Sequence, residues 1–223
     1  MPFFLIALKL PPENAVVTSL LIQIGGMGSA SAAFARQQRI DFKLAFMVLL
    51  IALPGIALGA LAASYLSASY MQFILGVLVL LTAFLFVSGS QKYHDFGKKK
   101  VLLRGNYKKL WMAVPASLGS GLLSSSMNEW LIPVFRRKLS LGMHYAIASS
   151  IFISFMVSVI AAAIHLGLGH QANWIIVLWA VPGVIAGAQL GAKFTHKLNE
   201  KVLKEVFIFF MTLVGVHLMY NSY

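Results

Sequence analysis

Long apolar stretches alternate with short polar segments along nearly the whole chain. A helix rises about 1.5 Å per residue, so crossing a hydrocarbon core about 30 Å thick takes roughly 20 apolar residues. Several stretches reach that length, and they predict an all-α polytopic bundle with no soluble domain between its spans. The six predicted crossings lie at 14–35, 44–65, 69–90, 143–168, 173–194 and 202–221.

The composition agrees with a chain that lies in a lipid bilayer. Hydrophobic residues make up 59% of the 223 positions and charged residues 11%, and the mean hydropathy is +0.82. Soluble domains are roughly half apolar and a quarter charged. Cysteine is absent, which excludes disulfides and thiol chemistry. The opening MPFFLIALKL has no basic residue before it and no convincing cleavage site, so a removable signal peptide is not expected.

The net charge of +12 is explained by membrane topology. Lysine and arginine concentrate in four loops, at 36–43, 92–109, 136–138 and 193–204. The turns at 67–70 and 169–172 carry none. The positive-inside rule therefore places the four basic loops in the cytoplasm and the C-terminus outside the cell membrane. Nucleic acid is not expected as a partner.

Two parts of the chain resemble each other. LPGIALGALA at 53–62 matches VPGVIAGAQL at 181–190, and AVVTSLL at 15–21 matches AIASSIF at 146–152. Loops that are basic in one copy are neutral in the other, apart from Lys9, so the copies are expected to have opposite orientations. Transporters often place their substrate path between such inverted repeats. Chance similarity among helices rich in glycine and alanine is the alternative.

This pattern divides the chain into three parts. The first membrane repeat is expected at 1–91, a basic cytoplasmic loop at 92–109 and the second membrane repeat at 110–223. The matched motifs contain four residues that should shape the helices. Pro54 and Pro182 would bend them, because proline removes a backbone donor and clashes with the preceding turn. Gly55 and Gly183 would let neighbouring helices approach.

The segment 110–135 lies between two basic loops on the same side, and about 25 residues cannot cross twice. We therefore predict a re-entrant hairpin: a helix from about Trp111 to Ser124, a break at SSSMN, and a second helix from about Glu129 towards Arg137. Broken backbone at this depth must be lined by protein or water. The amides that begin the second helix carry partial positive charge, which suits an anion.

Polar residues in the break and on neighbouring helices are the candidate substrate path. Glu129 could bind a proton that travels with the anion, or it could cap the helix that it begins. The other helix residues could equally be hydrogen-bonding contacts that hold helices together. The candidates are Ser124, Ser125, Ser126, Asn128, Glu129, Gln23, Ser149, Ser150 and Gln189.

No metal or other cofactor is expected. His144 and His165 lie at opposite ends of one predicted helix, and metal ligands must converge. The chain has no HExxH motif and no pair of buried carboxylates that could act as acid and base, so no catalytic residues are assigned.

These segments carry a family resemblance. GSGLLSSSMNEWLIPVF, AIASSIF and VPGVIAGAQLGAKFTHKLNEKVLKEVFIFFMTLVGVHLMY resemble the second half of the sulfite exporter TauE/SafE family. PPENAVVTSLLI, RQQRIDFKLA and LPGIALGALA resemble its first half. The resemblance implies a protein that moves sulfite, organosulfonates and related sulfur-containing or carboxylate anions across the cytoplasmic membrane of prokaryotes.

Two departures from the family pattern stand out. SSSMNE replaces the glycine-rich turn, and the counterpart of this turn in the first half is missing, because Met1 aligns with Ile132. The sequence therefore predicts that the chain is either a fragment that begins at a downstream start codon or a degenerate copy.

The function predicted from the sequence is transport of small, sulfur-containing anions by alternating access. The alternatives are a passive anion channel and a non-transporting membrane scaffold subunit. The expected partners are a small anion, the lipid bilayer and a coupling proton. The particular anion, the direction of transport and the oligomeric state stay open.

Overall fold

The computed structural model describes residues 8–63, 65–66, 68–88, 110–111, 113–124 and 127–194, together with 4, 209, 212–213, 215–217 and 220. The basic loop at 92–109 and most of the crossing expected at 202–221 lie outside these residues.

The described chain forms helices at the predicted positions. The helices are α2 (Pro12–Arg36), α3 (Phe42–Ala63), α4 (Ala68–Ser88), α5 (Ala113–Leu123), α6 (Asn128–Leu139), α7 (Met143–Gly167) and α8 (Trp174–Phe194). By length and composition α2, α3 and α7 can each cross a membrane, whereas the apolar parts of α4 and α8 are shorter. The predicted all-α architecture is thus confirmed for the described residues, and two short helices, α5 and α6, occupy the segment where a broken helix was predicted.

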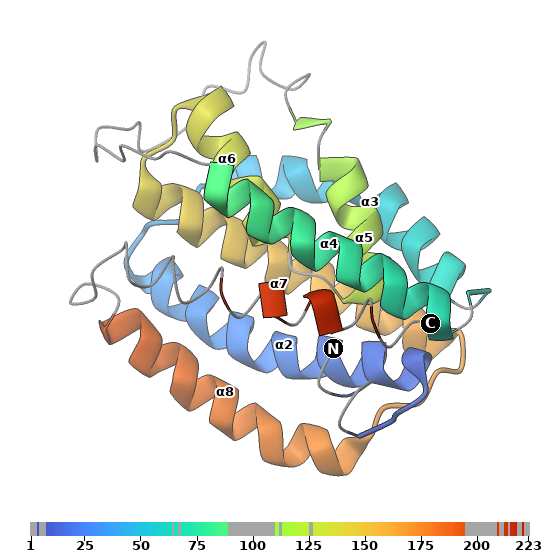
Figure 1. Cartoon of the computed structure of the whole chain (residues 1–223). Coiled ribbons are helices and arrows are strands. Elements are labelled where there is room, and N and C mark those ends of the chain that lie inside the picture. Colours follow the sequence, from blue (N-terminus) through green and yellow to red (C-terminus); the bar gives the residue numbers. More distant parts are fainter. Residues whose placement is uncertain are drawn as a thin grey trace.

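The helices α2 and α7 pack side by side in opposite directions (Figure 1). Glu13 at the start of α2 faces His170, which follows the end of α7. At the other end, the amide of Asp41, which follows α2, donates to Ser149 Oγ near the start of α7 at 3.0 Å. This antiparallel pair is the centre of the bundle.

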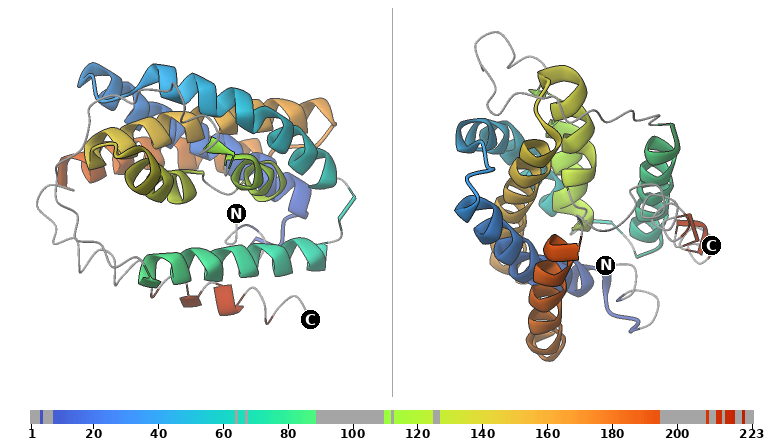
Figure 2. Two further views of the ribbon diagram at one scale, coloured as in Figure 1. Left: turned by 90° about the horizontal axis from the view of Figure 1, so that it is seen from above. Right: turned by 90° about the vertical axis from the view of Figure 1, so that its left-hand side faces the viewer.

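Each proline-containing helix packs on one member of this pair. The helix α3 lies against α7, where Phe42 and Phe46 make edge-on ring contacts with Phe152. The helix α8 lies against α2, where a Cβ on Gly25 would be 2.8 Å from Val181 Cγ1. Figure 2 shows α4 on the flank of the bundle, beside the described pieces of the C-terminal segment.

The first arm of the broken helix, α5, packs closely on α3. A Cβ on Gly55 would collide with Ser117 Oγ and the Val114 carbonyl, and one on Gly59 would be 2.9 Å from the Leu122 amide nitrogen. Such backbone-to-backbone packing requires small residues, as is usual between membrane helices. It places the end of α5 in the buried centre, beside α2 and α7.

Candidate functional site

The break between α5 and α6 lies beside the central third of α2 and of α7, the two long helices of the central pair. Gln23 on α2 donates from Nε2 to the Ser124 carbonyl oxygen at 2.7 Å. Ser158 on α7 donates from Oγ to Gln23 Oε1 at 3.2 Å. At about 1.5 Å per residue, Gln23 is roughly 15–20 Å from either end of α2. Gln23 therefore links the break, α2 and α7 near the mid-length of these two helices.

Ser124 follows the last residue of α5 in the left-handed conformation, with φ 52°. Residues in this conformation commonly end helices, although glycine is the usual choice. The residue is 3% exposed, and its Oγ has no hydrogen-bond partner within the described part of the chain. Burying a hydroxyl without a partner costs on the order of 1–3 kcal/mol, so an acceptor ligand would be favoured here.

A stripe of buried serines runs along α7. Ser150, Ser154 and Ser158 recur every fourth residue and therefore share one face of the helix. Ser150 Oγ is satisfied locally, because it donates to the Ile147 carbonyl at 2.9 Å. Ser154 Oγ has no partner among the residues that the structure describes. Ser154 and Ser158 were not selected as candidates from the sequence. A serine in an apolar helix looks the same in the sequence whether it only packs against a neighbouring helix or lines a binding site.

A second carbonyl near the end of α5 is held by α7. His165 is fully buried, and its Nε2 donates to the Gly121 carbonyl at 2.8 Å. The last four carbonyls of a helix lack partners within that helix, and lipid cannot supply them. His165 and Gln23 thus satisfy two such groups, at Gly121 and Ser124.

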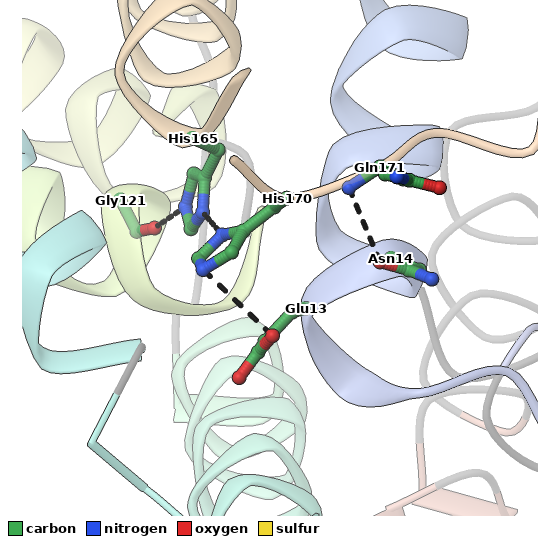
Figure 3. Close-up of polar contacts among 6 residues, drawn as sticks. All are labelled: Glu13, Asn14, Gly121, His165, His170 and Gln171. Carbon is green, nitrogen blue, oxygen red and sulfur yellow. Dashed lines mark hydrogen bonds and ion pairs between the residues drawn. The ribbon is translucent and has the colours of Figure 1, made fainter. Parts of the chain in front are cut away.

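The same histidine belongs to a polar cluster, shown in Figure 3. His165 Nδ1 lies 2.9 Å from His170 Nδ1, and His170 Nε2 lies 3.8 Å from Glu13 Oε2. Beside it, the Gln171 amide donates to Asn14 Oδ1 at 3.3 Å. Sequence reasoning missed this cluster. The available signal was that both Glu13 and His165 lie at span ends predicted to be on the same side.

Another candidate on α7, Ser149, has a structural partner. Ser149 is buried and its Oγ accepts the hydrogen bond from the Asp41 amide, while Asp41 Oδ1 accepts from the Leu44 amide at 3.2 Å. Asp41 therefore caps the start of α3. These contacts place Ser149 at the end of the helix pair, apart from Ser124.

Gln189 pairs with α2 at a third place. Its Nε2 donates to Ser29 Oγ at 2.7 Å, and this contact is exposed. The helix-shaping glycines also differ in their surroundings: Gly55 contacts α5, whereas no described atom lies within 4 Å of a Cβ on Gly183. Pro54 and Pro182 are both exposed within continuous helices.

The remaining candidates begin the second arm. Asn128 is the first residue of α6 and is partly buried, and Met127 before it forms no side-chain cap. Glu129 lies in the first turn, but its side chain is outside the described part of the structure, as are Ser125 and Ser126. Both roles suggested for Glu129 therefore stay predictions. Among the described residues, no group of three or more histidine, aspartate or glutamate side chains is arranged so that it could hold a metal ion.

Comparisons with known proteins place the chain in a family. The model of the family described as sulfite exporter TauE/SafE matches residues 1–218. A probable membrane transporter protein of Bacillus subtilis, YunE, is 23% identical in an alignment of 225 positions that covers 95% of this chain and 82% of that relative. A probable membrane transporter protein of Haemophilus influenzae is 23% identical over 215 residues, covering 96% and 82%. No solved structure gives a significant match. The chain belongs to the sulfite exporter TauE/SafE family and is a multi-pass membrane protein.

Proposed function

We propose that this membrane protein transports small anions such as sulfite, sulfonates or other organosulfur anions by alternating access between two inverted repeats. Membership of the TauE/SafE family and the similarity to probable membrane transporter proteins support transport. The binding site is the break between α5 and α6. The basic loops of the protein face the cytoplasm, and its C-terminus lies outside the cell membrane.

One observation carries the assignment of the site. Ser124 and Ser154 each keep a buried hydroxyl that no described residue pairs with. Both belong to elements that Gln23 and Ser158 join at mid-depth. The helix α6 begins just beyond the break, so its amides add partial positive charge. Neutral donors and a helix N-terminus can bind an anion without burying a cation.

The packing also supports the inverted repeats. The helices that match in sequence, α2 with α7 and α3 with α8, run in opposite directions (Figure 1). Each proline-containing helix packs on the long helix of the other proposed repeat, α3 on α7 and α8 on α2. Rocking of one repeat against the other would expose the break to each side in turn.

Flux into vesicles tests the function. We expect purified protein in proteoliposomes to give saturable uptake of at least one anion among sulfite, thiosulfate, sulfoacetate, sulfate and small carboxylates. Uptake above the external concentration, driven by a proton gradient, distinguishes a transporter from a passive channel. A folded protein that moves none of these anions would favour the scaffold alternative.

Paired serine variants test the site. Ser154→Ala removes the hydroxyl without a partner, and we expect the KM for the transported anion to rise about tenfold, as for a lost hydrogen bond to a charged group. Ser150→Ala is the matched control one turn away, because its hydroxyl is already satisfied by the Ile147 carbonyl. Equal effects of the two variants on KM would place the anion elsewhere.

A further inference from the structure

The cluster of Glu13, His165 and His170 connects the start of α2 with the end of α7 and the residues after it, which lie far from α2 in the sequence. Glu13 lies in the first turn of α2, His165 in the last turn of α7, and His170 in the connection to α8. The cluster reaches α5 through the Gly121 carbonyl. Exposure falls along it: the side chain of Glu13 is 44% exposed and that of His170 9%, while His165 is fully buried.

Its hydrogen bonds limit where protons can lie. A carbonyl can only accept, so His165 Nε2 carries a hydrogen. The two Nδ1 atoms, 2.9 Å apart, share one further hydrogen, because two bare nitrogens or two N–H groups would repel each other. If both imidazoles are neutral, His170 therefore has its hydrogen on Nδ1, and a bare Nε2 faces the Glu13 carboxylate.

One additional proton removes the repulsion between the lone pair on His170 Nε2 and the Glu13 carboxylate. On His170 Nε2 it makes an imidazolium that faces the Glu13 carboxylate, and on Glu13 it makes a carboxylic acid that faces Nε2. In either case the cluster changes from a net charge of −1 to 0. The acidic group facing His170 comes from α2 and the second imidazole from α7, while α5 contributes the neutral Gly121 carbonyl.

We propose that Glu13, His170 and His165 form a proton-binding site whose occupancy controls the position of the α5 end, and that this is where the coupling proton binds. The second part rests on the proposed transport function. The proton enters at the exposed Glu13, and the hydrogen bond between the imidazoles links it to the buried His165. Its loss leaves His170 facing the carboxylate with a lone pair, which weakens the hold on His165 and hence on Gly121.

The proton site contacts α5 at Gly121, which lies three residues before Ser124. The proton and the anion would therefore both act on the same end of α5. Gly121 and Ser124 offer carbonyls to His165 and Gln23, respectively. A shift of α5 that follows deprotonation would therefore change the geometry of the break. This connection couples proton binding to anion binding without any direct contact between the two ligands.

Imidazole protonation can be measured without any substrate. In protein labelled with ¹⁵N at histidine, we expect His170 to gain a proton on Nε2 as the pH is lowered, with His165 keeping its hydrogen on Nε2. Glu13→Gln removes the negative partner, and we expect about threefold weaker proton binding at His170, as for a partly exposed ion pair. His170 signals that are identical in the two proteins would overturn the site.

Transport then tests the coupling. Thiosulfate remains ionised between pH 5 and 8, so the pH dependence of its uptake reports on the protein. We expect His170→Gln to abolish uptake driven by a proton gradient, while exchange of thiosulfate across the membrane persists. His144→Gln, an exposed position near the opposite end of α7, is the control and should leave both processes unchanged.

The outcomes separate the two proposals. If vesicles move none of the tested anions but the ¹⁵N titration behaves as expected, the proton site stands and the transport function fails. If His170→Gln retains gradient-driven uptake of thiosulfate, the coupling role fails and the transport function stands.

Discussion

The helices α3 and α8 share a motif but not an environment. In α3, Gly55 and Gly59 face α5 so closely that an added Cβ would collide with its backbone. In α8, Gly183 and Gly187 correspond to them in sequence, yet no described atom lies within 4 Å of either position. The space around Gly183 and Gly187 would therefore accept a larger side chain within the described structure. Glycines of this motif matter where a second helix approaches them, and within the described chain only the two in α3 have such a neighbour.

The exposed side of α8 extends beyond the glycines. Ile175, Leu178 and Trp179 are 72–79% exposed, and the described contacts of α8 are concentrated on α2. A helix inside a membrane can present such residues to lipid, because lipid tails are as apolar as the side chains themselves. The difference between α3 and α8 predicts different responses to the same substitution.

The largest difference is expected for Gly59→Ala and Gly187→Ala. The first adds a Cβ against the Leu118 carbonyl and the Leu122 amide, and overpacking of this kind costs about 1–3 kcal/mol. The second adds a methyl group in open space and should stabilise α8 by up to about 1 kcal/mol through helix propensity. Thermal unfolding in detergent measures both. Equal destabilisation would show that another helix covers α8.

The reciprocal test uses two glycines of α5. A Cβ on Gly121 would collide with the Ile56 carbonyl, whereas one on Gly119 would make an ordinary contact with Leu78 at 3.6 Å. We expect Gly121→Ala to lower the free energy of unfolding by about 1–2 kcal/mol and Gly119→Ala to leave it unchanged or raise it. A Gly119 variant as unstable as the Gly121 variant would mean that α5 is sensitive for a reason other than its contact with α3.

The smallest effect is expected where α8 does have a partner. At Gly25 of α2 a Cβ would be 2.8 Å from Val181 Cγ1, while at Gly26 the nearest atom, Val184 Cβ, is 3.4 Å away. A side chain can move more easily than a backbone, so Gly25→Ala should cost about 0.5–1 kcal/mol, towards the mild end of overpacking. Adding Val181→Ala should restore stability, as a double-mutant cycle would show. No recovery would mean that the strain lies elsewhere.

The positions of the helices along the chain could be predicted because hydrophobic length is a local property. The spans, the break at SSSMN and the close approach at Gly55 follow from composition and spacing. The partners of the break could not be predicted, since Gln23 meets Ser124 across 101 residues and His165 meets Gly121 across 44. The matching motifs also gave no indication that Gly55 would be covered by α5 while Gly183 would have no described neighbour.

The sequence identified polar residues within the helices as candidates, but it did not show which of them lie at the break and which hold helices together. Gln23 and Ser124 lie together at the break, whereas Ser149 contacts Asp41 at the end of the helix pair. Every buried serine has the same local signal, and only tertiary contacts distinguish a hydroxyl that is satisfied from one that is not. Ser154 was for this reason not separated from Ser150.

The position of Gln23 gives the central helix pair a mechanical property. A contact near the mid-length of two antiparallel helices acts as a fulcrum, so that tilting one helix in the plane of both axes opens one end and closes the other. With arms of roughly 17 Å, a tilt of about 10° displaces each end by about 3 Å. Separation of Glu13 from His170 would then accompany tighter contact between Asp41 and Ser149 at the other end of the pair.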